Sequence, residues 1–432
     1  MTKELGKKNK LSTEPYKGVR DFYPEEQAVQ DYIFGKMRKT VESFGYVEYG
    51  ASLLEPTELY EAKSGEELIN EQTYSFKDRG DRSVTLRPEM TPTVARMIAS
   101  KRRELSFPLR WYSIPNAFRY ERPQRGRVRE HWQLNADLFG AEGIDADAEI
   151  ISLAYKILTD MGAKDSDFEI KINFAGILMQ YLKKKFDLDK EKANALVKVI
   201  DRYGKISEED FEKRAKDIIG DLPDGKAGKT PELLDILKKK DIREFDNYEE
   251  IKYLEELKDK LDIKVEVDPF LTRGFDYYTG MVFEVYDTNP ENNRSVFGGG
   301  RYDNLLEIFD AEKVPAVGFG MGDVPVKNFL EVRGLIPEYV STTDLMLCTL
   351  SVENITFAQG LATRLREQGL NVAVDIGERK IDKQIKSADK QSIPFVMCIG
   401  DEEEKTGKFK LKELKTGNEV EITEEEIKNI IF

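Results

Sequence analysis

From His131 to Leu138, polar and apolar side chains alternate without a break within the segment EHWQLNADLF at 130–139. A period of two belongs to the β-strand, because successive side chains point to opposite faces of a sheet. The polar face of this strand would carry His131, Gln133, Asn135 and Asp137. Residues 109–121 read as the outgoing arm of the same hairpin, which places the strand inside a large domain. A polar face in that position is either exposed to solvent or part of a site.

The residues before this hairpin indicate a mixture of helix and strand. Apolar side chains at helical spacing predict a helix from Pro24 to near Gly45. A strand is predicted at 83–87. Thr91 follows it and is expected to cap a further helix, with Pro92 at the first helical position.

The composition and the predicted secondary structure of the chain change twice after the hairpin. Residues 175–262 are rich in Lys and Glu and carry only helical patterns, which indicates a helical insertion. Strand signals resume at 263–287, and residues 336–343 read as a linker. Beyond the linker, strand and helix patterns alternate, which predicts a small α/β domain with a parallel or mixed sheet. The polar, Lys-rich residues 1–14 are expected to form a disordered arm.

The acidic composition of the chain does not by itself exclude a nucleic-acid partner. The chain has 432 residues with 67 Lys and Arg against 81 Asp and Glu, a net charge of −14. An acidic total argues against a nucleic-acid partner, yet a basic patch can lie within an acidic total. Cys348 and Cys398, the two cysteines, lie in apolar strand-like runs and read as buried thiols in a reducing compartment. Without an apolar signal segment or a long apolar run, the chain is expected in the cytoplasm and away from membranes.

The segment RYERPQRGRVR at 119–129 is the densest candidate for a binding site. It holds Arg119, Arg122, Arg125, Arg127 and Arg129. Guanidinium groups match phosphate oxygens in bidentate geometry, so this pattern favours a polyanionic ligand. The alternative is a solvated charged hairpin loop. His131, the single histidine, is interpreted as a hairpin residue without a catalytic role.

Three further segments combine charged and polar groups with glycines. TRGFDYYTG at 272–280 offers one cation and two tyrosines, although Arg273 could simply pair with Asp276 in a tyrosine-rich hairpin. FGGGRYD at 297–303 permits close backbone approach to a ligand or a tight bend. LRPEMTP at 86–92 could hold an ammonium group between a carboxylate and a hydroxyl.

These segments together resemble a known family. FRYERPQRGRVREHWQ is similar to motif 2 of class II aminoacyl-tRNA synthetases, and FLTRGFDYYTGMVFE and FGGGRYDNLL are similar to the two peptides peculiar to histidyl-tRNA synthetases. KGVRDFYPEE, LRPEMT and PAVGFGMG fit that family in the same order. The last ninety or so residues, with DIGERKIDKQIKSADKQSIPFVMCIGDEE as their core, resemble its anticodon-binding domain.

The resemblance implies an α+β protein with an antiparallel-sheet catalytic domain at 15–335, the insertion at about 175–262, and an α/β anticodon-binding domain at 344–432. It implies ATP-dependent activation of L-histidine to histidyl-adenylate, followed by transfer to the 3′ end of tRNA(His), by a homodimer. ATP with Mg²⁺ is the expected co-substrate, and no side chain is assigned to a metal.

The resemblance also implies individual residue roles. Arg119 and Arg273 would be catalytic, stabilising the α-phosphate as the histidine carboxylate attacks it. ATP would further be bound by Glu121 and Arg127. Histidine would be bound by Glu89, Thr91, Gln133, Asp137, Tyr277 and Tyr278. The tRNA would be contacted by Arg122, Gln124, Arg125, Lys383 and Lys386.

Two positions depart from the family pattern. Ser52 stands where motif 1 usually has proline, and Pro325 stands where motif 3 usually has an arginine on the nucleotide. Either ATP is held differently, with more weight on Arg127 or Arg301, or activation is impaired. The alternatives are therefore non-catalytic paralogues: a histidine-sensing regulatory subunit of ATP phosphoribosyltransferase, which usually lacks the C-terminal domain, or a tRNA sensor. The helix of motif 3 is expected to begin near Pro325.

Overall fold

A computed structural model describes most of the chain. It covers residues 11–431 other than 62–71, 122–127, 201, 204–205, 221–228, 240–244, 246–247, 273–276, 293–294 and 378. The chain forms two compact units that meet between Ile336 and Pro337. Among the described residues, no helix has the length and apolar character needed to cross a membrane.

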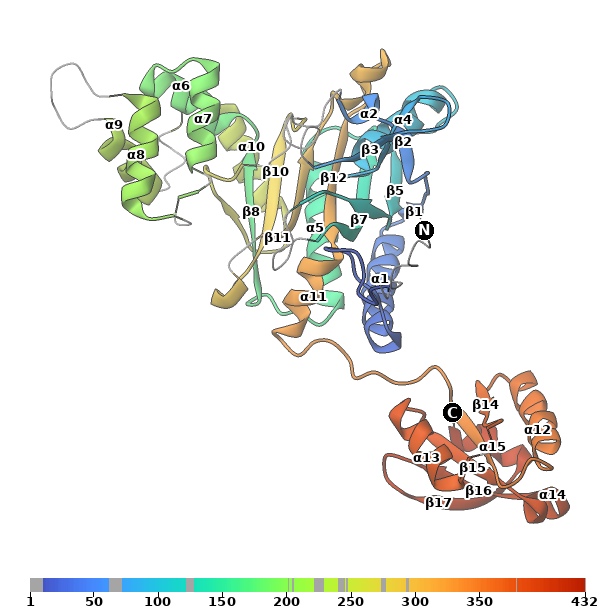
Figure 1. Ribbon diagram of the computed structural model, residues 1–432. Coiled ribbons are helices and arrows are strands. Elements are labelled where there is room, and N and C mark those ends of the chain that lie inside the picture. Colours follow the sequence, from blue (N-terminus) through green and yellow to red (C-terminus); the bar gives the residue numbers. More distant parts are fainter. Residues whose placement is uncertain are drawn as a thin grey trace, which may run out of the picture. The chain divides into compact units, whose positions relative to one another are not determined.

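A largely antiparallel sheet forms the centre of the first unit (Figure 1). Within the described residues it has nine strands in the order β1-β5-β7-β12-β11-β10-β8-β9, with β6 pairing β7 beside this path. The strands are β1 (Val47–Glu48), β5 (Leu109–Ser113), β6 (Asn116–Phe118), β7 (Glu130–Phe139), β8 (Phe168–Phe174), β9 (Val265–Val267), β10 (Met281–Asp287), β11 (Ser295–Arg301) and β12 (Ala316–Gly322). Among the described pairings of this sheet, only β1–β5 and β8–β9 are parallel. The expected antiparallel fold class is confirmed.

The predicted hairpin is present, but its outgoing arm is divided in two. Ser113 pairs with Asn135 in β5, and Asn116 pairs with Trp132 in β6. Pro115 lies between the two strands and has no N–H to give to a ladder, although its carbonyl accepts the Gln133 N–H at 3.0 Å. A proline therefore interrupts the arm without changing its direction.

Helices cover the apolar face of this sheet. They are α1 (Pro24–Ser43), α5 (Ile144–Asp160) and α11 (Asp323–Glu331). Leu134, Ala136 and Leu138 of β7 are fully buried in the core that these helices form. Helix α1 begins and ends as predicted, and α11 begins two residues before Pro325, where proline is still tolerated in the first turn.

The polar face of the sheet is covered in part by α4 (Thr91–Lys101) and the 3₁₀ helix η3 (Leu305–Phe309). The prediction that Thr91 caps α4 is wrong: Met90 occupies the cap position and Thr91 is the first helical residue. Pro92 accordingly takes the second position, which still needs no intrahelical N–H donor.

The described residues between β8 and β9 form helices only, as the Lys/Glu-rich pattern predicted. They are α6 (Ile177–Phe186), α7 (Lys190–Ile200), α8 (Glu208–Ile219), α9 (Lys229–Lys239) and α10 (Tyr248–Lys260). Helix α10 is the last of them and packs on α5, β8 and β9, so it is one of the helices that cover the central sheet (Figure 1).

A small sheet beside the central one presents its apolar face outward. In the described residues it has the order β2-β4-β3, formed by β2 (Leu54–Pro56), β4 (Ser83–Leu86) and β3 (Tyr74–Lys77), with α2 (Glu58–Glu61) following β2. The inner face is polar: Glu55 is buried and accepts a 2.7 Å bond from Arg96, and Thr85 is buried against Ser75. By register the opposite face carries Leu54, Pro56, Tyr74, Phe76, Val84 and Leu86.

The second unit is a mixed α/β domain, as the alternating pattern predicted. Its described strands have the order β14-β13-β15-β16-β17, parallel among the first three and antiparallel after β15. The elements are β13 (Leu345–Thr349), α12 (Ile355–Glu367), β14 (Val372–Val374), α13 (Ile381–Lys390), β15 (Phe395–Ile399), α14 (Asp401–Thr406), β16 (Lys408–Glu413), β17 (Glu419–Thr423) and α15 (Glu424–Ile431). The two cysteines are neighbours in register on β13 and β15 and are free thiols.

Candidate active site

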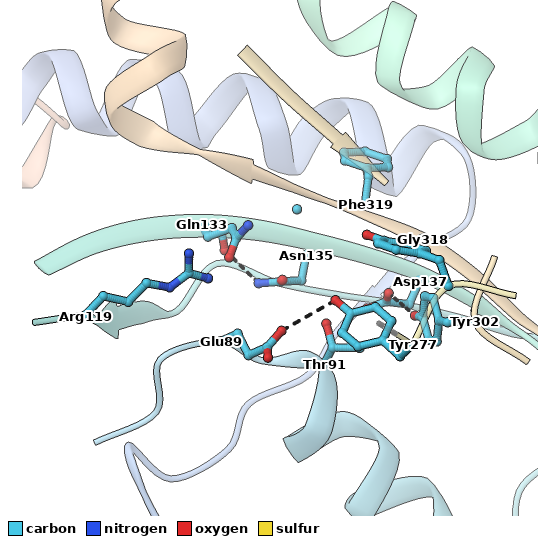
Figure 2. A pocket seen from close by; sticks show the side chains of 12 residues that line it. Glu89, Thr91, Arg119, Gln133, Asn135, Asp137, Tyr277, Tyr302, Gly318 and Phe319 are labelled. Carbon is cyan, nitrogen blue, oxygen red and sulfur yellow. Dashed lines mark hydrogen bonds between the residues drawn. The ribbon is translucent and has the colours of Figure 1, made fainter. Parts of the chain in front are cut away.

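A pocket lies on the polar face of β7, at the centre of the large sheet (Figure 2). It is lined by Glu89, Thr91, Arg119, Gln133, Asn135, Asp137, Tyr277, Tyr278, Tyr302, Gly318, Phe319 and Gly320. The seven described residues that the resemblance assigned to catalysis or to amino-acid binding all lie in this one pocket. They come from four separate segments of the chain: 89–91, 119, 133–137 and 277–278.

The polar side chains of β7 have room because the neighbouring strand carries glycines. Gly318 of β12 is paired with Asp137, and Gly320 is paired with Asn135. A Cβ atom on Gly318 would lie 2.1 Å from Asp137 Oδ1, and one on Gly320 would lie 2.0 Å from Gln133 Nε2. Any larger residue at either position would displace a side chain of the pocket, which explains a strand that reads GFGMG.

Asp137 is a buried carboxyl group. It is 4% exposed, and its Oδ1 accepts a hydrogen bond from the Tyr302 hydroxyl. Burial raises the pKa of Asp137 to about 7, although the Tyr302 hydrogen bond acts in the opposite direction. Burial and the nearby Asp137 raise the pKa of Tyr302 well above its ordinary value, so this hydroxyl stays a donor. The pair gives the pocket an acceptor whose charge changes near neutral pH.

A second carboxylate faces Asp137 across the pocket. Glu89 is 3% exposed, and its Oε2 accepts a bond of 3.5 Å from the Tyr277 hydroxyl. Thr91 lies two residues further along the chain, at the start of α4 (Figure 2). A carboxylate, a hydroxyl and the amide of Gln133 can together surround an ammonium group, which has three donors.

Arg119 brings a positive charge to the opposite end of the pocket (Figure 2). Its Nε donates to the Pro88 carbonyl at 2.9 Å, and its backbone N–H donates to the Arg129 carbonyl at 2.9 Å. These bonds fix the guanidinium before any ligand arrives, which is the property needed of a group that stabilises developing negative charge.

His131 precedes the pocket residues on β7 but does not line the pocket. Burial, with Arg119 and Arg20 nearby, lowers the pKa of His131 to about 3. The imidazole is therefore neutral at physiological pH.

The remaining predicted site residues lie elsewhere or cannot be placed. Glu121 lies beyond β6, where its carbonyl accepts a bond of 3.2 Å from Arg129 Nε. Lys383 and Lys386 are exposed on α13 of the second unit. The predictions for Arg122, Gln124, Arg125, Arg127 and Arg273 fall outside the described residues.

Sequence reasoning did not assign five residues of the pocket. Asn135 was placed on the polar face without a role, and its Nδ2 donates to the Gln133 carbonyl at 3.1 Å. Tyr302 was quoted within FGGGRYD, but nothing in that motif shows that its hydroxyl reaches a strand two places away in the sheet. The pattern of glycines at every second position of β12 was the available signal for Gly318 and Gly320.

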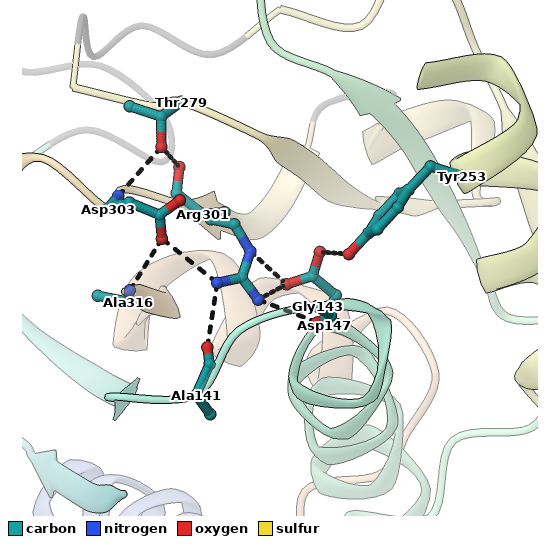
Figure 3. A network of polar contacts seen from close by, with 8 residues as sticks. All are labelled: Ala141, Gly143, Asp147, Tyr253, Thr279, Arg301, Asp303 and Ala316. Atoms are coloured by element: carbon teal, nitrogen blue, oxygen red, sulfur yellow. Dashed lines mark hydrogen bonds and ion pairs between the residues drawn. The ribbon is translucent and has the colours of Figure 1, made fainter. Parts of the chain in front are cut away.

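Arg301 does not replace the arginine that motif 3 lacks, contrary to one of the two options above. It is 7% exposed, and its Nε donates to Asp147 at 2.9 Å. Its remaining donors are taken by Asp303 and by carbonyls of the loop before α5 (Figure 3). A guanidinium with five donors committed to the protein has none left for a phosphate.

The start of α11, where Pro325 stands, is fixed by a different arginine. Asp323 is buried and accepts a bond of 2.8 Å from Arg20 and one of 3.0 Å from the Trp132 N–H. Burial raises the pKa of Asp323, and the Arg20 guanidinium opposes that shift. Arg20 of the N-terminal KGVRDF segment thus holds Asp323, which follows β12 and in turn accepts the Trp132 N–H near the start of β7.

Comparisons with known proteins agree across both units. A family model described as histidyl-tRNA synthetase matches residues 18–324, and one described as an anticodon binding domain matches residues 344–431. A curated histidine–tRNA ligase from Leptospira biflexa is 39% identical over 423 residues, covering 96% of each chain. One from Haloarcula marismortui is 36% identical over 427 residues, covering 94% of each. The crystal structure of apo S. aureus histidyl-tRNA synthetase matches with a TM-score of 0.73 at 27% identity, over 98% of this chain and all of that one.

Proposed function

Because this chain belongs to the histidyl-tRNA synthetase family and is a histidine–tRNA ligase, we propose that the pocket on β7 is where L-histidine is bound and activated. The observation that carries this proposal is the convergence of Glu89, Thr91, Gln133, Asp137 and the tyrosine pair 277–278 on one pocket with Arg119 at its end.

The two ends of the pocket would bind the two ends of the amino acid. Asp137 and Tyr278 would hydrogen-bond the two imidazole nitrogens, while Glu89, Thr91 and Gln133 would bind the ammonium group. Tyr277 would hold Glu89 in place through its hydroxyl. A site whose buried groups are left unpaired by a wrong ligand rejects that ligand strongly, so Asp137 would supply most of the selectivity.

Activation needs charge stabilisation rather than a protein nucleophile. The histidine carboxylate attacks the α-phosphorus of ATP, a bond forms between carboxylate oxygen and phosphorus, and pyrophosphate leaves. Arg119 and Arg273 would stabilise the charge on the α-phosphate, and Arg127 would bind the outer phosphates. Glu121 would lie near the adenine. Mg²⁺ would enter with ATP as part of the substrate, because it binds chiefly through phosphates and water.

The second step passes histidine to the terminal ribose of tRNA(His). Arg122, Gln124 and Arg125 would contact the acceptor end, and Lys383 and Lys386 on the exposed side of α13 would contact the tRNA through the second unit. Guanidinium and ammonium groups favour phosphate oxygens irrespective of the net charge of the whole chain.

We place the enzyme in the cytoplasm, with a catalytic domain at 15–335, its insertion at about 175–262, and an anticodon-binding domain at 344–432.

Histidine-dependent exchange of pyrophosphate into ATP tests the function. The full-length match to curated ligases, second unit included, favours an active enzyme over the histidine-sensing paralogue and the tRNA sensor. Exchange should require histidine and proceed with no other amino acid at comparable rates. A protein that binds histidine without exchange would be a sensor, and equal exchange with a second amino acid would refute the assignment.

We also propose that the enzyme is a homodimer built on the outward apolar face of β2, β4 and β3. Leu54 and Phe76 on this face are 45% and 49% exposed, whereas Glu55 and Thr85 on the opposite face are buried. Strand β2 lies in the segment that resembles motif 1, which the family uses at its dimer interface. A sheet that buries its polar side and exposes its apolar side needs a second surface to cover it.

Sedimentation should find a particle of twice the 49.6 kDa chain mass for the wild-type protein. Phe76→Lys should shift it to the single chain at micromolar concentration, because a buried unpaired charge opposes association. Leu11→Lys is the matched control, since Leu11 is 93% exposed and outside this face. A monomeric wild-type protein, or a Phe76→Lys dimer of unchanged stability, would exclude this interface.

A further inference from the structure

Arg301 lies at a junction between the histidine pocket and the rest of the first unit. Its backbone carbonyl accepts the Thr279 N–H at 2.8 Å, and Thr279 directly follows the two pocket tyrosines, 277 and 278. The residue after Arg301 is Tyr302, whose hydroxyl donates to Asp137. A shift of the Arg301 backbone would therefore move Tyr302, which donates to Asp137, and the segment that carries Tyr278.

The side chain of Arg301 is anchored on the opposite side by Asp147 of α5. Arg301 Nε lies 2.9 Å from Asp147 Oδ1, and a second guanidinium nitrogen, Nη2, lies 2.5 Å from the same oxygen. Asp147 is fully buried, and burial raises its pKa while Arg301 opposes that shift. A buried carboxylate of this kind is sensitive to the loss of any donor.

The third member of this network comes from the helical insertion. The Tyr253 hydroxyl, on α10, donates to Asp147 Oδ2 at 2.6 Å (Figure 3). Its donation leaves Oδ1 to Arg301, so each carboxylate oxygen has its own partner. The seating of α10 on α5 therefore satisfies the second oxygen of Asp147 and supports the carboxylate that anchors Arg301.

We propose that Tyr253 is a positioning residue for histidine: through Asp147 and Arg301, the helix α10 of the insertion sets the position of Tyr302 and of the 277–279 segment. This proposal rests on the function proposed above. The insertion would then contribute to amino-acid binding, because the packing of α10 on α5 and the position of the pocket residues depend on the same hydrogen-bond network. This role also explains why Arg301 is committed entirely to the protein.

The test is Tyr253→Phe, which removes the hydroxyl and keeps the ring. In pyrophosphate exchange, KM for histidine should rise about three- to tenfold, since part of the free energy of the lost hydrogen bond to the charged Asp147 is transmitted to the pocket through Arg301. KM for ATP and kcat should stay within about twofold, because Arg119 is held by separate bonds. Histidinol, which carries the imidazole and ammonium but no carboxylate, should lose the same factor as an inhibitor.

Tyr155→Phe is the matched control. The Tyr155 hydroxyl, on α5, donates to Asp165 at 2.6 Å, a tyrosine–aspartate hydrogen bond at the surface, and neither residue lines the pocket. It should leave KM for histidine unchanged. Asp147→Asn is the second variant, which retains an oxygen acceptor but removes the charge that holds Arg301, and it should raise KM for histidine at least as much as Tyr253→Phe.

Three results would overturn the proposal. One is an unchanged KM for histidine in Tyr253→Phe, and another is an equal loss in both KM values and in kcat, as a general destabilisation would give. The third is a rise in KM for Tyr155→Phe of the same size. Wild-type protein without histidine-dependent exchange would instead refute the proposed function, so the two failures are separable.

Discussion

Arg119→Ala is expected to lower kcat for histidine-dependent pyrophosphate exchange by about 100- to 1,000-fold, the usual cost of removing one preorganised group that stabilises developing charge. Its guanidinium is held at the end of the pocket by the bond from Nε to the Pro88 carbonyl. KM for histidine should change little, since Glu89 and Asp137 bind the parts of the amino acid that do not react. The split between kcat and KM is the feature to measure.

Two further variants serve as controls for Arg119→Ala. Arg119→Lys keeps the charge but loses the planar fork, so kcat should fall to an intermediate value. Arg103→Ala removes an exposed arginine of the same unit and should leave kcat unaltered. A rate for Arg119→Ala within about threefold of wild type would remove Arg119 from the charge-stabilising role.

Asp137→Asn is expected to separate activity from stability. Asparagine still accepts the Tyr302 hydrogen bond but offers the imidazole an uncharged partner. Histidine activation, measured as kcat/KM, should fall at least about 100-fold, because a site built around one hydrogen-bonding group discriminates steeply against its loss. In the empty protein the same substitution removes a buried charge and should be stabilising above neutral pH.

The sign of this second effect follows from the raised pKa. Asp137 titrates at about 7 in the folded protein and at 3.8 in an ordinary setting. Between these values the folded state keeps a proton that the unfolded state has lost, so the wild-type stability falls as pH rises through that window and levels off above pH 7. Asparagine does not titrate, so the variant escapes this decline.

Thermal unfolding of the wild-type protein and of Asp137→Asn, without ligand at pH 5 and pH 8, measures this pH-dependent difference in stability. The stability difference in favour of Asp137→Asn should be larger at pH 8, by about 2–3 kcal/mol for two units of pH within the window. Other titrating groups are common to both proteins and cancel. A difference that is the same at both pH values would mean that Asp137 titrates normally.

The sequence was most informative where a short local pattern determined geometry. The alternation on β7 placed Gln133, Asn135 and Asp137 on one face without knowledge of the fold, and these three residues form one side of the pocket. Likewise, alternating strand and helix patterns after residue 344 were sufficient for the second unit, although the Lys- and Glu-rich hairpin β16–β17 did not stand out from solvent-exposed sequence.

Long-range partners could not be read in the same way. Tyr302 reaches Asp137 across 165 positions, and Arg301 reaches Asp147 across 154. Nothing local distinguishes an arginine that binds a nucleotide from one that anchors a helix, which is why Arg301 was given the wrong alternative role. The same limit applies to the β2–β4–β3 sheet, since alternation reveals two faces but not which of them turns inward.

The isolation of His131 makes the bound amino acid spectroscopically visible. It is the single histidine of the chain, and its pKa of about 3 keeps its ring neutral and its resonances stationary from about pH 5 to pH 9. Any imidazole signal that moves with pH in a nuclear magnetic resonance titration must then come from the ligand. The tautomer and charge of histidine in the pocket, which in most proteins are masked by the protein's own histidines, can be followed here without isotope labelling of the enzyme.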